Sequence, residues 1–548
     1  MKLASKLLFL YHFFMTTFDS LTLKAFIEEN STFLTGARIQ KIQQPTRRDF
    51  ILTVHGFSKD GIPETRKLYI NIDPQYYHIC FMNKENENLR SIEIPQHPPM
   101  FCMLLRKYLK NCRIGKVNQP PYERIIEFYI ETFNKSSEKI HLCFAVEFMG
   151  KHSNAVLYNA DTNVIIGCAH NVGAGKSRER EMSGTLPYFY PPKQNKTDIL
   201  DYNGTVDYTK LNTDFYWFSK HFTNQVKNTP LEKLKDYVRL KNTSPAISTD
   251  YAEYTLFSEL LDENIPQNSV NEMIDNYYAF HIQKNKIQTL KTSLASIINR
   301  KLKKSQTALS KMTIQLNKEK NADIYRLYGD LIMANLYNLK DFSKSIEVYD
   351  YENEKDITIE LDETISLKDN AAKFYKLYTK SKTSVQKLNE LTEKLQADIS
   401  YYEDILYAVE IAETVDDLRE IQLEIIPEQE EKRIKSPHSN QPLEFKIENE
   451  KVFAGRNNRQ NDYIVSRLAK DEDYWFHIKG CAGSHVLLCA QNPSDKLIYE
   501  CAKLAKEYSS AKLSKKAGVI YTQKKYLKKP PGANLGYVTY SNEKEIVV

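Results

Sequence analysis

Residues 302–316 read LKKSQTALSKMTIQL, in which Leu302, Leu309 and Leu316 are spaced seven residues apart with Met312 between them. Apolar residues at this spacing form the seam of a coiled coil. The stretch therefore predicts a long helix that packs along another helix.

The surrounding region has the same character. It contains no proline between Pro266 and Pro427, so long helices can run through it. A second seven-residue series comprises Leu388, Leu395, Tyr402 and Val409, with Ile399 and Leu406 interleaved. We expect a long antiparallel coiled-coil arm over residues 271–425, whose longer helix reaches ~90 Å at about 1.5 Å per residue. A globular helical bundle is the alternative. Alternating residues in Ile357–Leu361 predict a small β insertion over 341–367 between the two series.

The N-terminal part mixes strand-like and helical segments. Phe50–Val54 and Ile125–Ile130 predict strands, and Pro99–Lys110 predicts a helix. We expect an α+β domain over residues 15–200. A polar, helical connecting domain should follow over residues 205–270.

The C-terminal part predicts a second mixed domain. A segment rich in Pro, Glu, Lys and Ser at 426–450 is typical of a linker. Strands at Tyr474–Ile478 and His485–Leu488, with a helix at Leu497–Ser509, indicate a compact α/β module over 451–548. The fold class is therefore multidomain α+β.

Length, charge and cysteines narrow the class of protein. A chain of 548 residues exceeds one hydrophobic core, and its net charge of +6 is only mildly basic. Residues 451–548 hold 17 Lys and Arg against 9 Asp and Glu. The 8 cysteines form no C-x-x-C pair, which indicates reduced thiols in a cytosolic protein with no metal site.

The first residues superficially suggest a signal peptide. Leu7–Phe14 is apolar, but it is too short to cross a bilayer and no small-residue cleavage site follows. We expect translation to start at Met15 and no membrane segment.

Two motifs resemble parts of enzyme active sites, but their residue spacing does not fit the chemistry. Gly173–Ser177 resembles the end of a phosphate-binding loop, but His170 occupies the position of its first glycine, so a basic surface loop is the better interpretation. Ser484 and His485 are consecutive, and consecutive residues of a strand face opposite ways. We expect a structural or phosphate-contacting role for this pair.

Two other motifs fit nucleic acid. Tyr521–Gly532 interleaves lysines with tyrosines, which suits phosphates and stacked bases, although a solvated lysine-rich edge is the alternative. Glu123 and Arg124 precede a predicted strand, where a guanidinium can grip phosphate; an ordinary surface pair is the alternative.

Taken together, these motifs resemble bacterial NFACT proteins of the RqcH type, once called fibronectin-binding protein A. The N-terminal match runs through Gly36–Pro45, Pro98–Lys107, Glu147–Asn154 and Tyr190–Lys196. The C-terminal match runs through Gly455–Asp462, Trp475–Ile478, Gly483–Val486 and Lys528–Ala533.

The resemblance implies a cytoplasmic, ribosome-associated scaffold with no enzymatic activity and no cofactor. Such a protein would bind, as a monomer, the large ribosomal subunit through 23S rRNA while the subunit still carries peptidyl-tRNA. It would recruit alanine tRNA and support C-terminal alanine tailing of the stalled chain for degradation, with peptide bonds made by ribosomal RNA.

The resemblance also assigns site residues. The family's Asp-Arg pair for tailing falls on Glu123 and Arg124, and its Glu-Ile-Met patch falls on Glu147, Phe148 and Met149, with Lys151, His152 and Asn154 following. In the C-terminal domain it implies RNA contacts by Arg456, Asn457, Arg459, His477, Ser484, His485, Lys524, Lys525, Lys528 and Lys529. The connecting domain resembles a helix-hairpin-helix, with Asn242 at the expected turn glycine.

Two rival functions follow from the same resemblance. The older family name suggests a surface adhesin that binds fibronectin, but the sequence has no repeat array or wall anchor. The second is DNA repair, because the N-terminal domain of the family is related to DNA glycosylases whose nucleophile is an N-terminal proline amine. This chain starts Met-Lys-Leu or, from Met15, Met-Thr-Thr, so it lacks that nucleophile.

Overall fold

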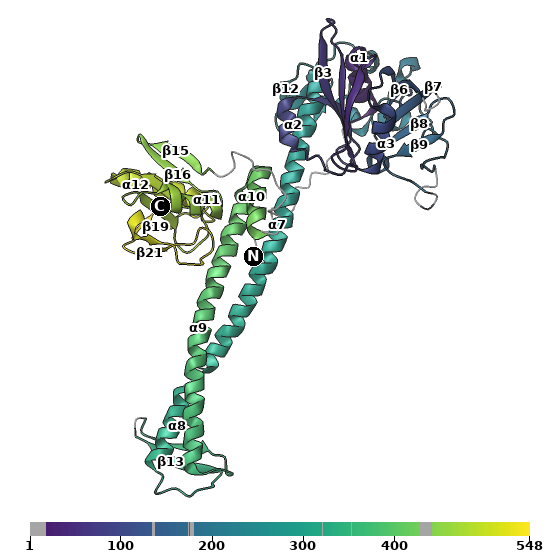
Figure 1. The fold of residues 1–548 in the computed structure, drawn as a ribbon. Helices are drawn as coiled ribbons and strands as arrows, with labels where there is room; N and C mark the ends of the chain where they lie inside the picture. Colours follow the sequence, from purple (N-terminus) through teal and green to yellow (C-terminus); the bar gives the residue numbers. More distant parts are fainter. Residues whose placement is uncertain are drawn as a thin grey trace. The chain divides into compact units, whose positions relative to one another are not determined.

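The computed structural model describes residues 18–133, 137–173, 175, 180–319, 322–351, 353–426 and 441–548 (Figure 1). The expectations for Leu7–Phe14 and Met15, and most of Gly173–Ser177, lie outside these residues. The chain divides into two units, Met1–Lys286 and Ile287–Val548. No described helix is both long enough and apolar enough to cross a membrane.

The first unit contains two antiparallel sheets in simple strand order. The four-stranded sheet comprises β1 (Arg38–Gln43), β2 (Asp49–Phe57), β3 (Pro63–Asn71) and β4 (His78–Met82). The five-stranded sheet comprises β5 (Ile114–Asn118), β6 (Ile125–Phe133), β7 (Lys139–Glu147), β8 (Asn154–Asn159) and β9 (Ile165–Cys168). Helices α1 (Ser20–Leu34), α2 (Lys84–Arg90) and α3 (Met100–Leu109) accompany them, so the expected strands and helix are present.

The connecting segment was expected to be helical, but it also contains short strands. It contains α4 (Leu211–Asp214), α5 (Lys220–Gln225), α6 (Leu231–Val238) and the strands β10 (Ala246–Ser248), β11 (Tyr254–Thr255) and β12 (Asn264–Pro266). Phe222, Tyr237 and Tyr254 share one hydrophobic core with α1 and both large sheets. Asn242 has φ of 55°, the left-handed conformation expected where the family has glycine.

Helix α7 (Val270–Glu319) begins in the first unit, where a buried ion pair anchors it. The carboxylate of Asp275 accepts from Arg90 Nη1 at 2.6 Å, and both side chains are almost fully buried. A charge buried without a partner is costly, so this pair fixes the first turns of the helix.

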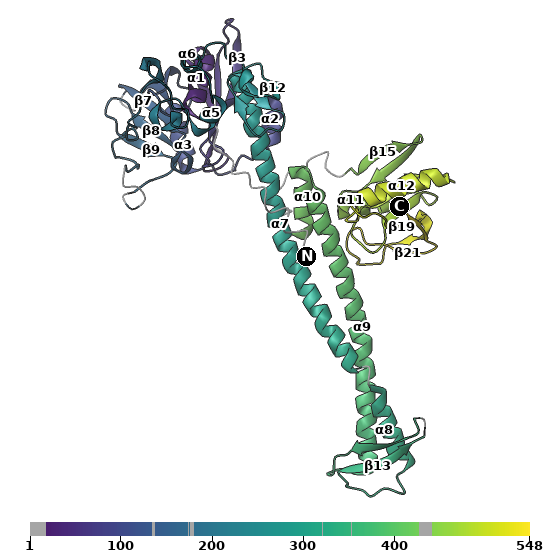
Figure 2. The same cartoon turned by 180° about the vertical axis from the view of Figure 1, so that it is seen from behind.

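In the second unit, α7 from Ile287 onward and α9 (Leu367–Ile411) run side by side and antiparallel, as Figures 1 and 2 show. Leu294 and Ile298 of α7 pack with Ile405 of α9 and with α10 (Val415–Ile425). At the far end lie α8 (Asp323–Ala334) and the hairpin of β13 (Ser345–Asp350) and β14 (Lys355–Glu360), within the residues where a β insertion is expected. The coiled-coil assignment itself stays a prediction.

The C-terminal domain is built on a six-stranded sheet in the order β15-β16-β18-β17-β19-β22. Its strands are β15 (Leu443–Ile447), β16 (Glu450–Ala454), β17 (Tyr474–Ile478), β18 (Val486–Cys489), β19 (Gly518–Gln523) and β22 (Lys544–Val547). Its other elements are α11 (Asn458–Tyr463), a π-helix (Ile464–Leu468), α12 (Asp495–Glu507), β20 (Leu527–Lys528) and β21 (Thr539–Tyr540).

Strand β15 corrects the expected linker, because residues 443–447 belong to this sheet. Phe445 and Ile447 pack against the domain core, and β15 pairs with β16 along its whole length. Residues 427–440 of the expected linker lie outside the described part of the chain.

Candidate nucleic-acid interface

Strand register brings three separate motifs to one end of the five-stranded sheet. Glu123 and Arg124 precede β6, Glu147 ends β7, and Asn154 begins β8. Ile125 pairs with Glu147, which also pairs with Asn154. The N–H of Phe148 donates to the carbonyl oxygen of Arg124 at 2.8 Å, which closes this end of the sheet.

Arg124 is the half-buried cation at the centre of this sheet end. Its Nη1 donates to the hydroxyl of Tyr77 at 2.8 Å, and its guanidinium lies 5.7 Å from the centre of that ring. Burial lowers the pKa of the Lys196 amine, and the charge of Arg124 lowers it further. The Lys196 amine itself donates to the carbonyl oxygen of Asn212 at 2.7 Å. The sequence did not indicate Tyr77, whereas Lys196 ends the matched motif Tyr190–Lys196.

Glu123 is half-buried beside Arg124. Burial raises the pKa of its carboxyl, while the guanidinium groups of Arg124 and Arg180 act against the rise. Its carbonyl oxygen accepts from the Gln119 amide at 2.8 Å.

Three of the residues assigned to tRNA lie behind the surface. Glu147 is 0% exposed, its carboxylate is bound by both terminal nitrogens of Arg180, and it accepts from the Tyr188 hydroxyl at 2.9 Å. Phe148 is also 0% exposed and packs edge-to-face on Phe18. The Asn154 amide bonds the backbone of His170 at 2.8 and 3.0 Å.

These positions correct the expectation of direct contact, since a ligand cannot reach buried side chains whose polar atoms are already bonded. Glu147, Phe148 and Asn154 instead hold the sheet end in shape. The residues that do reach solvent are Lys151 and His152, in a short 3-10 turn (Gly150–His152), with Met149 half-buried before it.

The charges of two arginines in the β1–β2 turn act on His170, whose backbone is bonded to Asn154. Burial lowers the pKa of His170, and the charges of Arg48 and Arg47 lower it further. Because these arginines come from a turn over a hundred residues away in sequence, only the fold reveals their proximity.

In the C-terminal domain, the Gly455–Asp462 motif faces the helices of its own unit. Arg456 Nη1 pairs with Asp417 at 2.9 Å, and Asn457 Nδ2 donates to Glu420 at 2.9 Å. The neighbouring Asn458 donates to Glu424 at 3.2 Å. The side chains of Arg456 and Asn457 are thus bonded to α10, and their expected RNA contacts stay a prediction.

His477, Ser484 and His485 form part of a packed wall around Trp475. The rings of Trp475 and His477 are stacked with centres 5.7 Å apart, and His485 lies edge-on to both. Burial lowers the pKa of both histidines. The imidazoles are therefore neutral near pH 7, and with Ser484 and His485 buried, packing is their evident role.

The four lysines after β19 differ in what surrounds them. Lys525 pairs with Glu472 at 3.3 Å, and Lys529 pairs with Asp462. Within the described residues no ion pair is seen for Lys524 or Lys528, and Lys528 is exposed. The available positive charge of this segment thus resides mainly on Lys524 and Lys528.

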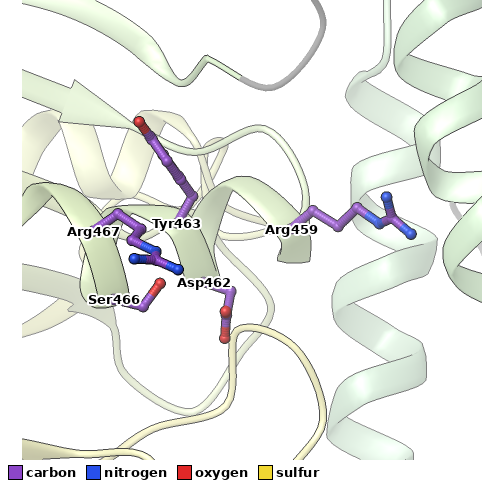
Figure 3. A pocket seen from close by; sticks show the side chains of 5 residues that line it. All are labelled: Arg459, Asp462, Tyr463, Ser466 and Arg467. Atoms are coloured by element: carbon purple, nitrogen blue, oxygen red, sulfur yellow. The ribbon is translucent and has the colours of Figure 1, made fainter. Parts of the chain in front are cut away.

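A hollow of about 420 Å³ adjoins Lys529 and is lined by Arg459, Asp462, Tyr463, Ser466 and Arg467 (Figure 3). Figure 3 shows Arg459 extending toward a neighbouring helix, while Arg467 and Tyr463 lie on the other side of Asp462. The sequence pointed to Arg459 alone among these residues, since Tyr463 and Arg467 form no recognisable pattern.

Fold and site together define a multidomain α+β protein with a long helical region and a C-terminal RNA-binding domain. Residues 19–228 and 211–442 match the NFACT N-terminal and middle domains, and residues 443–540 match the NFACT protein RNA binding domain. The chain belongs to the NFACT family.

Curated relatives align along almost the whole chain. The protein named Rqc2 homolog RqcH of Bacillus subtilis is 28% identical, over 97% of this chain and 98% of its own. Its namesake in Streptococcus pneumoniae is 26% identical over the same shares. A solved C-terminal fragment of the fibronectin/fibrinogen-binding protein from Streptococcus suis is 26% identical, with 48% of this chain and 94% of that one covered and a TM-score of 0.39.

Proposed function

We propose that this protein is a ribosome-associated quality-control factor. It binds the large ribosomal subunit carrying peptidyl-tRNA, recruits alanine tRNA, and supports C-terminal alanine tailing of the stalled chain. Its contribution is positioning, which lowers the entropic cost of bringing the tRNA to its place of reaction. Peptide bonds are made by ribosomal RNA, and the protein is a scaffold.

The observation that carries this proposal is the sheet end around Arg124. The half-buried Arg124 donates to the hydroxyl of Tyr77, and the exposed Lys151 and His152 lie in the turn that follows Glu147. A cluster of cations beside a tyrosine suits the phosphates and bases of RNA. Family membership and the matched RNA-binding domain support the same partner class.

An Arg124→Ala variant tests the role of this sheet end in tailing. We expect tail synthesis to fall by at least about a hundredfold, since a lost positioning contact of a few kcal/mol has an effect of this order. Cosedimentation with large subunits should change less than about twofold, because one phosphate contact among many is lost. Tail lengths and subunit binding are measured in the same extract.

Arg239→Ala is the matched control, because Arg239 is an exposed arginine of the same unit. Tailing at the native level in Arg124→Ala would contradict the assignment. Sequencing of RNA that copurifies with the full chain tests the class itself: alanine tRNA with 23S rRNA is expected. Recovery of the native protein mainly from washed cell surfaces would instead favour the adhesin.

A further inference from the structure

The outer face of helix α7 is a strongly basic surface that the sheet-end site does not use. Between Asp275 and Glu319 the sequence has no Asp or Glu, but it has nine Lys and Arg. Charged residues make up 27% of the chain with nearly equal signs, so this helix is an exception. The imbalance is local and specific to α7.

Helix geometry concentrates part of this charge in one stripe. Arg300, Lys303, Lys304, Thr307, Ala308 and Lys311 line a shallow hollow of about 450 Å³. At about 100° per residue all of them except Ala308 lie on the side opposite Ile298, which packs toward α9 and α10. The four cations are exposed. We call these six residues the α7 stripe.

Other cations of α7 are directed toward the partner helices. Lys291 Nζ donates to the carbonyl oxygen of Glu410 at 2.6 Å, and Lys301 Nζ donates to that of Ile425 at 3.3 Å. The α7 stripe shows no ion pair within the described residues. Its like charges at i,i+3 and i,i+4 spacing weaken the helix, so folding does not account for them.

We infer that the α7 stripe binds the phosphate backbone of RNA, at a site separate from the C-terminal domain and the sheet end. The stripe is ~16 Å long, from Arg300 to Lys311, which matches several successive phosphates of one strand. It offers no large apolar residue to insert into a membrane, unlike an amphipathic surface helix. This inference rests on the proposed function, because it gives that function a second RNA contact.

The test compares two triple variants of the full chain. K303Q/K304Q/K311Q removes three charges from the stripe, and K376Q/K380Q/K387Q removes three exposed lysines from α9. Glutamine is a good helix former, and circular dichroism checks that the helices persist. The probe is a labelled RNA duplex of about 20 base pairs, titrated between about 50 and 200 mM salt.

For the stripe variant we expect about tenfold weaker binding at low salt and a salt slope smaller by about 2–3. The α9 variant should lose less than about threefold. Equal losses in both variants, or none in the stripe variant, would overturn the inference. So would a selective loss of binding to phosphatidylserine vesicles or to an acidic peptide with RNA binding unchanged.

The design separates failure of the inference from failure of the proposed function. If the wild-type chain cosediments with large subunits and the stripe variant binds RNA normally, the inference alone fails. If the wild-type chain neither cosediments with large subunits nor binds the duplex, both fail. Should the triple variant lose helicity, single K304Q is expected to reduce the slope by about 1, and an unchanged slope would again overturn the inference.

Discussion

The sheet end around Arg124 and the Gly455–Asp462 motif were both expected to contact RNA, but their arginines have different partners in the structure. The Arg124 guanidinium rests on the phenol of Tyr77. The Arg456 guanidinium is paired with Asp417. A family motif therefore identifies candidate positions. The contacts of each side chain in the fold are needed to tell whether it can bind a partner or is bonded to its own chain.

The largest expected effect is a loss of stability when Glu147, which is buried at the sheet end, loses its cation. Arg180→Ala leaves the fully buried Glu147 carboxylate without its cation, which should cost about 3–5 kcal/mol of unfolding free energy. The chain has two tryptophans, Trp217 and Trp475. Urea unfolding followed by Trp217 fluorescence in a Trp475→Phe background reports the first unit alone.

A surface role for Glu147 would be indicated if Arg180→Ala left this transition in place. Adding Glu147→Gln should recover part of the loss, because the uncompensated charge is removed. Arg239→Ala, at an exposed arginine of the same unit, is the control and should shift the transition by less than about 0.5 kcal/mol.

The corresponding test of the C-terminal motif is Asn457→Ala. Asn457 caps α11 by accepting from Gln460 N at 2.9 Å and also donates to Glu420. Its loss should cost about 1–3 kcal/mol, measured through Trp475 in a Trp217→Phe background. RNA affinity of the folded variant should stay within about twofold; a tenfold loss without destabilisation would restore the RNA-contact assignment.

The contact between α9 and the C-terminal domain should depend on pH, because Asp404 of α9 is buried against Gly483. Burial and the nearby Glu403 raise the pKa of Asp404 to about 7, above its unfolded value near 4. The folded state therefore binds the proton more tightly, and this group's contribution to stability is lost as pH rises from about 4 to about 7. Asp404→Asn should add roughly 1–3 kcal/mol at pH 8 and little at pH 5.

Urea unfolding of the wild type and Asp404→Asn at both pH values, followed by Trp475, measures this difference. Asparagine keeps an acceptor for the N–H of Gly483, so the hydrogen bond is not what changes. An equal difference at pH 5 and pH 8 would show that Asp404 does not titrate between them.

The smallest expected effect separates the lysines after β19. Lys528→Gln should weaken RNA binding about threefold, since one available phosphate contact is lost. Lys525→Gln should weaken it less, because Glu472 already offsets that charge. Fluorescence titration with single-stranded RNA at low salt measures both; a larger loss for Lys525→Gln would reverse this order.

Periodicity predicted the parts of the fold that it governs. The seven-residue series fell on α7 and α9, and the alternation of Ile357–Leu361 fell on β14. Periodicity did not predict two of the strands. Strand β11 is only Tyr254–Thr255, and Leu443–Ile447 alternates but follows a segment typical of a linker. A strand of two residues is too short for a period to be recognised, and in β15 the linker-like composition of the preceding residues outweighed a short alternation.

The candidate site was predictable in sequence position but not in burial. Glu123, Arg124 and Glu147 do meet, but only the β6–β7 register shows that Glu147 points inward to Arg180. Tyr77 and Arg180 reach the site through tertiary packing, for which a single sequence carries no signal.

Glu127 on β6 lies fully buried under the same sheet, and four donors surround it. Its two oxygens accept from the Asn118 amide and from the hydroxyls of Tyr129, Tyr158 and Tyr190 at 2.6 to 3.2 Å. Each of the two oxygens thus accepts two hydrogen bonds. Glutamine has the same shape, but its NH2 group would require the two partners of the replaced oxygen to accept instead of donate, which a hydroxyl can do and the Asn118 amide nitrogen cannot. In redesign of this sheet the isosteric exchange would therefore not be conservative.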